Sequence, residues 1–337
     1  MRERLRLWVA ASFYYSGVVK LALWWQRRFR RRLIILNYHR ASGEHLRRQL
    51  DYLRCHYHVM HAEAALEGFF QQGKTDKALH ASPLPLVLTF DDGYQDNYTI
   101  AFALVRELRV PITIYLIPGY LESGANFWWQ EGARLARNAQ VDEITIDEIT
   151  YSLSQPAERK ALAKAIDRHA RYASAVAERE AFLTSISQQL AVPPHAAEKN
   201  ENQPMTWAQV NEMAKSEWVS FGAHTMHHPL LACLEDTDEL QYEVSECRRV
   251  LETRLGHPVR TFAYPIGKPE HFGEKAQQAV QEAGYQWAIT TIEATNTPQT
   301  NHFMLGRLPG DPDQHWLIMA SELAGLLGNF SRLRKIL

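Results

Sequence analysis

Two adjacent carboxylates, Asp91 and Asp92, follow the apolar segment L-V-L-T-F, which has the character of a buried strand. Two acids at the tip of such a strand are costly unless a cation or a reaction uses them. Neighbouring strand side chains point to opposite faces, but the chain turns at the carboxyl end, and Gly93 allows both carboxylates to face one cavity. The alternative interpretation is an ordinary D-D-G turn with solvated acids.

A pair of histidines follows a second short strand-like segment, W-V-S-F-G. His224 and His228 lie four positions apart, so a helical turn would bring both imidazoles to one side, as metal sites require. His227 could replace one of them geometrically, and clustered histidines are otherwise surface residues. One aspartate with two histidines gives three protein ligands and an open position, which is the arrangement of catalytic zinc sites.

The second aspartate favours hydrolysis over the other chemistry of this ligand set. Two histidines and one carboxylate also serve non-haem Fe(II) oxygenases. A carboxylate beside a metal-activated water can accept its proton, while the metal polarises a carbonyl. We therefore expect a divalent metal as cofactor. The ligand types favour Zn²⁺, although iron, cobalt, nickel or manganese could occupy the same site.

These residues need a scaffold of alternating strands and helices, which is typical of a parallel sheet or barrel. Seven segments have strand character: Leu33–Asn37, Leu86–Phe90, Ile112–Ile117, Trp218–Gly222, Arg260–Tyr264, Trp287–Thr291 and Phe303–Leu308. Helical periodicity separates them, for example in Glu44–Cys55, Asn97–Leu108, Thr237–Leu255 and Gly273–Ala283. The predicted fold class is α/β.

The chain divides into three parts by pattern. Residues 1–32 form a basic aromatic N-terminal segment, residues 33–320 the barrel domain, and residues 321–337 a C-terminal helix or tail. The stretch of about 121–205 is too long for a loop and carries its own helical periodicity at 131–138 and 157–190, so it predicts a helical insertion. This insertion is a solvated cover or a lid.

The N-terminal segment suggests contact with a membrane. Arginines precede a mostly apolar stretch at residues 7–25, and a further cluster follows at residues 27–32. Its aromatic residues suit the headgroup boundary and its arginines suit anionic lipid. An interfacial helix, an amphipathic helix packed on the domain and a true span remain alternatives. No small-residue cleavage site follows this stretch, so we do not expect a removable signal peptide.

Composition sets the remaining bounds. The chain has 37 Lys and Arg against 38 Asp and Glu, which describes a globular protein and predicts no nucleic-acid partner. Its three cysteines show no disulfide framework and no cysteine metal site. We expect a bacterial protein in the cytoplasm or at the inner membrane, with peripheral membrane contact; the periplasmic side stays open.

Together, T-F-D-D-G and the later H-T-x-x-H resemble the polysaccharide deacetylases with the NodB homology domain, carbohydrate esterase family 4. The segment F-A-Y-P-I-G resembles the third motif of that family, and E-A-G-Y before a strand is a frequent late feature. The resemblance implies a distorted (β/α) barrel of about seven parallel strands. It makes Asp91 the general base, and Asp92, His224 and His228 the metal ligands, with Thr225 bracing the histidine loop.

Two departures from the family pattern concern the base and the general acid. Ala263 stands where an arginine commonly positions the base, so Asp91 needs another partner, either Arg307 or Arg260. The late motif also lacks the usual histidine acid.

We predict His39 as the acid, because it follows the first strand and barrel sites collect residues from strand tips. Its segment, Y-H-R, resembles the exopolysaccharide deacetylase branch that includes poly-N-acetylglucosamine deacetylases. His302 is a weaker candidate. The resemblance also implies an oxyanion site at the backbone N–H near Ile266. Trp128 and Trp129 could stack on sugar rings or serve packing alone.

The expected function is metal-dependent removal of N-acetyl groups from an amino-sugar polysaccharide of the cell envelope or an exopolysaccharide. A deacetylase or deformylase of a lipid-linked sugar is the first alternative. A non-catalytic glycan-binding relic of the same fold is the second, although the retained Asp91 argues against it.

Overall fold

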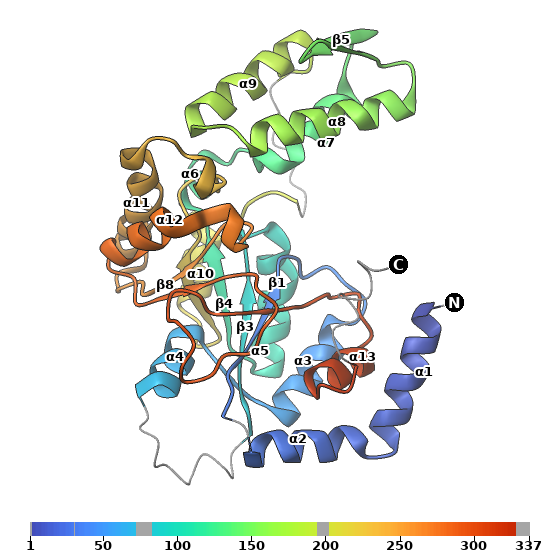
Figure 1. Cartoon of the computed structure of the whole chain (residues 1–337), viewed down its shortest axis with the longest axis vertical. Coiled ribbons are helices and arrows are strands. Elements are labelled where there is room, and N and C mark those ends of the chain that lie inside the picture. The colour runs from blue at the N-terminus through green and yellow to red at the C-terminus, as the bar shows by residue number, and fades with distance from the viewer. Residues whose placement is uncertain (1, 30, 72–82, 194–201, 328–337) are drawn as a thin grey trace.

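The computed structural model describes residues 2–29, 31–71, 83–193 and 202–327, and its centre is a parallel sheet (Figure 1). The strands follow the order β10-β1-β3-β4-β7-β8-β9, and every neighbouring pair is parallel. Their bounds are β1 Ile34–Tyr38, β3 Pro85–Phe90, β4 Ile112–Leu116, β7 Val219–Ala223, β8 Thr261–Ala263, β9 Trp287–Ile289 and β10 Leu308–Pro309. A short β2, His58–Met60, pairs with the first half of β3.

Residues 302–309 join the two edges of the sheet. The backbone of Ala288 on β9 donates to His302 O and accepts from Leu305 N. A few residues later, Leu308 on β10 is in register with Leu36 on β1. One short segment therefore contacts both edge strands and closes the sheet into a distorted (β/α) barrel, as the sequence predicted.

Alternate strand residues fill the barrel interior. Ile35, Val87 and Tyr115 belong to the interior cluster, whereas the adjacent Ile34 and Leu86 pack against the outer helices. Helix α4, Ala62–Gln71, adds four buried apolar side chains to the interior cluster and covers the amino end of the barrel. The carboxyl end is left for polar residues.

The outer layer consists of helices that follow the strands. They are α3 Leu46–His56, the π-helix η2 Asn97–Phe102 continued by α5 Ala103–Leu108, α10 Trp207–Ala214, the short 3-10 turn η3 Leu231–Cys233, α11 Thr237–Leu255 and α12 Pro269–Glu282. Their apolar faces form one large cluster with the outward side chains of the strands.

A second core lies in the chain between β4 and β7, at the top of Figure 1. It is built from α6 Pro118–Ser123, α7 Trp128–Asn138, α8 Pro156–Arg171, α9 Val176–Gln189 and an antiparallel hairpin of β5 Glu143–Ile146 and β6 Ile149–Ser152. Helices lie where the sequence indicated them. The hairpin was not predicted, although Ile144 and Ile146 alternate with exposed residues as half-buried strands do.

The N-terminal residues form two helices, α1 Arg2–Tyr15 and α2 Val18–Phe29, which pack beside α13, Trp316–Leu323. Within the described ranges, no single helix is long and apolar enough to cross a bilayer. The α1–α2 pair passes that test jointly, with a bend of 68° between its members. Most of the predicted C-terminal helix or tail, residues 328–337, lies outside the described residues.

Two predicted elements differ from the structure. The segment predicted as a strand at Phe303–Leu308 is mostly irregular, with a single β-bridge from Leu305 to Ile289, because Asn301 caps its start and the Asn296 side chain bonds both backbone groups of Gly306. The predicted helix Asn97–Leu108 begins as a π-helix, in which the Asn97 side chain donates to His39 O. The wider turns place that side chain against the β1 loop.

Candidate metal and catalytic site

A cavity of about 540 Å³ opens at the carboxyl ends of the strands. The tips of β1, β3, β7 and β10 and the turn after β8 supply its floor, and α7 and α8 of the insertion supply part of its wall. The lining residues are Asn37, His39, Asp91, Asp92, Tyr94, Trp128, Trp129, Arg171, His224, His228, Tyr264, Ile266, Lys268, Thr291, Glu293, Arg307 and Pro309. The predicted metal ligands Asp92, His224 and His228 and the predicted catalytic residues Asp91, His39, Ile266 and Arg307 all line this one cavity.

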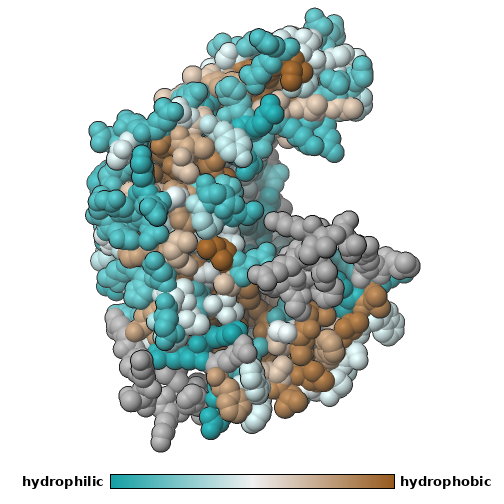
Figure 2. Space-filling model, in the orientation of Figure 1, coloured by the Kyte–Doolittle hydropathy of each residue, from teal (hydrophilic) through white to brown (hydrophobic). Residues whose placement is uncertain are grey.

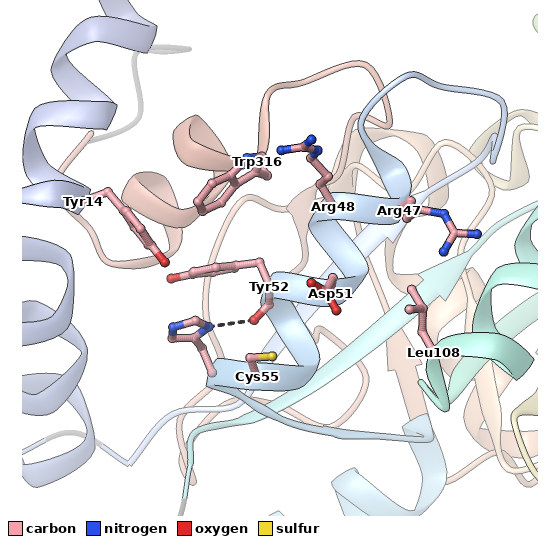
Figure 3. Close-up of a pocket in the computed structure, with 9 residues that line it drawn as sticks. Tyr14, Arg47, Arg48, Asp51, Tyr52, Cys55, Leu108 and Trp316 are labelled. Carbon is pink, nitrogen blue, oxygen red and sulfur yellow. Dashed lines mark hydrogen bonds between the residues drawn. The ribbon is translucent and has the colours of Figure 1, made fainter.

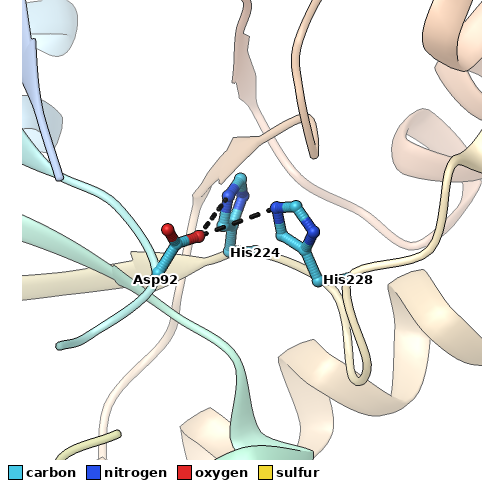
Figure 4. A group of neighbouring side chains, drawn as sticks. All are labelled: Asp92, His224 and His228. Carbon is cyan, nitrogen blue, oxygen red and sulfur yellow. Dashed lines mark ion pairs between the residues drawn. The ribbon is translucent and has the colours of Figure 1, made fainter. Parts of the chain in front are cut away.

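Asp92, His224 and His228 converge in its floor (Figure 4). Asp92 Oδ1 lies 3.4 Å from His224 Nε2 and 3.6 Å from His228 Nε2. One ligand atom from each residue lies within 4.8 Å of the others, and all three residues are buried. Asp92 Oδ1 has no hydrogen-bond partner among the described residues. A buried, unpartnered carboxylate oxygen between two imidazoles is the donor set of a divalent cation.

The loop after β7 fixes the orientation of both imidazoles. His224 Nδ1 lies 2.7 Å from Ala263 O, so it carries the proton and leaves the Nε2 lone pair facing Asp92. Thr225 Oγ1 donates to His224 O and accepts from His228 N at 2.9 Å. This is the bracing role that the family resemblance implied for Thr225. His227 points away, because its Nδ1 bonds Glu243 at 2.6 Å, so it is not an alternative ligand.

Four non-glycine residues of the site have left-handed backbone conformations. Their φ angles are 72° at Asp92, 65° at Thr225, 55° at His228 and 60° at Ile266. Such conformations are unfavourable for residues with a Cβ and are retained where the surrounding structure imposes them, often at functional sites. Gly93, to which the turn after β3 was attributed, also has a left-handed backbone, with φ of 73°, and Asp92 adopts the same conformation just before it.

The charges of the cluster favour an ionised aspartate and a neutral His228. Burial raises the pKa of Asp92, but the adjacent His224 and the charge of the nearby imidazoles outweigh it and lower that pKa to about 2. Burial, assisted by the charge of His224, lowers the pKa of His228 to about 3. Burial lowers the pKa of His224, but the proximity of the Asp92 and Asp91 carboxylates outweighs burial and raises it. A carboxylate and neutral imidazoles are the forms that bind metal.

Asp91 faces Arg307 rather than the histidines. Arg307 Nη1 donates to Asp91 Oδ1 at 2.8 Å, and Nη2 lies 2.8 Å from Oδ2. Both side chains are almost fully buried. Burial raises the pKa of Asp91, but the charges of Arg307 and His224 lower it below its usual value. Of the two partners considered for Asp91, Arg307 is the one in contact, whereas Arg260 bonds Glu63 through its backbone.

Arg307 is itself held by residues that the sequence analysis did not single out. Its Nη1 donates to Asn37 Oδ1 at 3.0 Å and lies 3.3 Å from Thr89 Oγ1, and its Nε donates to Thr290 O at 2.9 Å. Asn37 and Thr89 are polar positions inside apolar strands, which was an available signal. Asp96 was also missed: it is buried, and its Oδ2 accepts bonds from Arg40, Ala41 and Ser42, which fixes the loop after His39.

His39 and Ile266 lie on the cavity wall. His39 is exposed, and its charge contributes to lowering the pKa of both Asp91 and Asp92, which places it near the two carboxylates. Ile266 has a carbonyl that accepts from Thr291 Oγ1 at 2.8 Å, and its N–H donates to no described residue. His302 is not a cavity residue, because its ring packs 4.2 Å from that of Phe70.

The two adjacent tryptophans have different surroundings. Trp128 is buried, and its Nε1 donates to His228 O at 2.9 Å, so it packs under the histidine loop. Trp129 is half-buried, with its ring centre 4.5 Å from that of His228. It stacks on Phe127 and donates to Tyr94 at 2.8 Å. Of the two tryptophans, only Trp129 therefore keeps an appreciable exposed area at this cavity.

Solved deacetylase structures have a similar fold. Deacetylase PplD of Streptococcus pyogenes is 17% identical, with a TM-score of 0.54 over 86% of this chain and 96% of that one. IcaB from Ammonifex degensii is 18% identical with the same TM-score and coverage. The BpsB deacetylase domain from Bordetella bronchiseptica is 16% identical, with a TM-score of 0.51 over 83% of this chain and 96% of the domain. No curated protein sequence matches the chain.

The family assignment comes from the sequence itself. The model of the polysaccharide deacetylase family matches residues 80–288. The chain therefore belongs to the polysaccharide deacetylase family, as its motifs predicted, and is a hydrolase of amide bonds. The matched range contains Asp91, Asp92 and both histidines. His39 and Arg307 lie outside it, each next to one of the two strands, β1 and β10, that pair where the barrel closes.

Proposed function

We propose that this protein is a metal-dependent deacetylase that hydrolyses N-acetyl groups of an amino-sugar polysaccharide. The observation that carries the proposal is the pairing, in one cavity, of the Asp92, His224 and His228 cluster with a second buried carboxylate, Asp91, bound to Arg307. The first set suits a cation, and the second suits a base that must stay ionised.

The three buried ligand atoms fit a divalent cation, and Zn²⁺ is the ion we propose from the ligand types. A bound cation would supply positive charge that polarises the scissile carbonyl and acidifies the attacking water. The unpartnered Asp92 Oδ1 and the fixed tautomer of His224 support this fit. Asp92, His224 and His228 would hold the ion.

The remaining steps use residues of the chain. Asp91, kept ionised by Arg307, would accept the proton of the attacking water as the new C–O bond forms. The N–H of Ile266 would donate to the developing oxyanion. His39 would donate a proton to the nitrogen as the C–N bond breaks. The products are acetate and a glycan amine, which is cationic at neutral pH.

A deacetylase of a lipid-linked sugar is a second candidate. The exposed apolar surface of α1 and α2 favours it, because such a surface suits an enzyme that works at a bilayer. The two candidates share the chemistry of the site and differ in what carries the sugar. Comparison of N-acetylglucosamine oligomers with detergent-solubilised lipid-linked N-acetylated sugars as substrates separates them.

The first test is acetate release from N-acetylglucosamine oligomers by the full chain. We expect release by protein reconstituted with Zn²⁺, loss after chelation, and recovery when the ion is returned. Metal content is measured on the same samples. Protein that retains one ion per chain and releases no acetate from polymer or lipid-linked substrates would refute the proposal.

The acid role of His39 has a separate test. We expect His39→Asn to lose about 10²-fold in kcat on an amino-sugar substrate, because proton donation contributes at least this much. The loss should shrink on an N-acetylated substrate with a weakly basic leaving amine, which needs no donated proton. His302→Asn is the matched control and should leave kcat unchanged. Equal losses on both substrates would reject an acid role for His39.

A further inference from the structure

The N-terminal helix pair, α1 and α2, carries most of the exposed apolar surface. Ten large apolar side chains are exposed in the described part of the chain, and seven of them lie on these two helices. They are Leu5, Trp8, Tyr15, Leu21, Trp24, Trp25 and Phe29. Trp8 and Tyr15 are each 76% exposed. In the space-filling view, apolar residues gather at the lower right, where the pair lies (Figure 2).

These side chains form an outward stripe on each helix. On α1, Leu5, Trp8 and Tyr15 repeat at helical spacing, and on α2, Leu21 and Trp24 do the same. The opposite sides are buried in the protein. A helix of a water-exposed domain normally has the reverse arrangement, with its polar side outward. An exposed apolar area of this kind marks an interaction site.

The inner sides anchor the pair to the folded domain. Tyr14 points toward Tyr52 and Trp316 (Figure 3), and its ring centre lies 5.0 Å from that of Trp316. Val19 and Leu23 are buried in the main core, and Arg27 donates to His56 O at 2.6 Å. The outward side of the pair is therefore held in a fixed position relative to the barrel.

The charge of this region selects its partner. From Arg4 to Gly43 the chain contains no Asp or Glu, while Lys and Arg recur throughout. Arg4, Lys20 and Arg28 are exposed among the apolar residues of the pair. Two such surfaces would repel each other in a self-association, whereas an anionic lipid surface would attract both the cations and the aromatic rings.

Neither helix of the pair is long enough to cross a membrane alone. The helices have 14 and 12 residues. At about 1.5 Å per residue each is only about 20 Å long, shorter than a hydrocarbon core of about 30 Å. They are bent by 68° and are packed along one side against the domain. Such helices can lie along a surface with their outward sides inserted.

We propose that the N-terminal helix pair seats the protein on the surface of an anionic lipid bilayer. Leu5, Trp8, Leu21, Trp24 and Phe29 insert at the headgroup boundary, and Arg4, Lys20 and Arg28 bind anionic headgroups. Helix α2 precedes β1 and so lies at the amino ends of the strands, while the catalytic cavity lies at their carboxyl ends. The proposed membrane-binding surface is therefore separate from the catalytic cavity.

The test is flotation of the purified full chain with vesicles of phosphatidylcholine, with and without phosphatidylglycerol. We expect binding to the anionic vesicles and weak binding to the neutral ones. The double variant Trp8→Ser/Trp24→Ser should bind at least about 10-fold less. The triple variant Arg4→Gln/Lys20→Gln/Arg28→Gln should bind about 10²-fold more weakly to the anionic vesicles and be unchanged on the neutral ones. Tyr172→Ser/Tyr242→Ser removes two exposed rings elsewhere and is the matched control.

Circular dichroism and acetate release, measured on each variant, show whether it remains folded, and flotation itself needs no turnover. The proposal is supported if wild type floats with anionic vesicles and the Trp8→Ser/Trp24→Ser variant does not. Absence of flotation, or equal flotation of the tryptophan variant, overturns it. A dimer that these substitutions dissolve would identify a second copy as the partner. Resistance of the cellular protein to alkaline carbonate extraction would instead indicate an embedded span, and either result overturns the proposal.

Discussion

Asp91 and Asp92 are neighbours in the chain, yet their carboxylates have different partners. Asp91 is fully paired: both carboxylate oxygens face Arg307, which is itself bonded to Asn37 and the Thr290 carbonyl. Asp92 has a buried oxygen with no hydrogen-bond partner among the described residues, and this oxygen lies 3.4 and 3.6 Å from two imidazoles that are candidate metal ligands.

The difference in partners indicates different roles for the two carboxylates. A buried polar group without a partner costs free energy, so a protein retains it where something else completes it. The ion pair with Arg307 holds the charge of Asp91 in place, whereas the unpartnered oxygen of Asp92 is a candidate metal ligand. Adjacent residues of the same type can therefore be assigned different chemistry from their partners alone.

The sharpest test of this comparison exchanges each acid in turn for its amide. Asp92→Asn should lose bound metal and reduce acetate release by roughly 10⁴-fold, since metal activation contributes several kcal/mol. Asp91→Asn should retain the metal and lose about 10³-fold, the scale of a general base. Metal content and kcat are measured on both variants. Loss of metal from the Asp91 variant would contradict the division of roles.

A second test removes the partner of Asp91. Arg307→Met takes away the charge that lowers the pKa of Asp91, so that pKa rises. A base works only while ionised, so the acid limb of the pH profile of kcat/KM should move to higher pH. Breaking a buried ion pair should also cost about 3–5 kcal/mol of stability near neutral pH. The destabilisation should lessen at low pH, where Asp91 is protonated.

Arg260→Met is the matched control for this variant, because Arg260 lies at the start of the β8 region without contacting Asp91. Its pH profile should match that of wild type. An unchanged acid limb in Arg307→Met, measured with metal bound, would show that Arg307 has only a structural role.

The smallest effect is expected on metal affinity when the support of the His228 loop by Trp128 is removed. Trp128→Phe keeps an aromatic ring but removes the bond to His228 O, so metal affinity should fall by about 10-fold. At saturating metal, kcat should stay near that of wild type. Trp129→Phe removes a comparable bond to Tyr94 and should leave metal affinity unchanged. Competition with a chelating dye measures both affinities, and equal effects would argue against support of His228 by Trp128.

The sequence predicted the parallel barrel because strand and helix periodicities alternate, and the strands β1, β3, β4, β7, β8 and β9 each lie mostly within one predicted range. It also brought Asp91, Asp92, His224 and His228 together through their positions at strand ends. It did not predict the β5–β6 hairpin or the turn at residues 303–306, because local side-chain bonds decide these segments. The sequence did not decide between Arg307 and Arg260 as the partner of Asp91. Arg307 and Asp91 are far apart in the chain and meet only when the barrel closes, and local sequence patterns do not predict such a contact.

Arg307 comes from the segment that closes the barrel, and this has a consequence for how activity depends on folding. β10 consists of Leu308–Pro309, so few backbone bonds hold the seam between β9 and β1. A local opening of this seam would withdraw the guanidinium from Asp91 without unfolding the helices or the metal ligands. Catalytic competence would then be lost below the temperature at which the whole domain melts. The temperature of inactivation would then reflect the stability of the seam at β10 rather than the stability of the core.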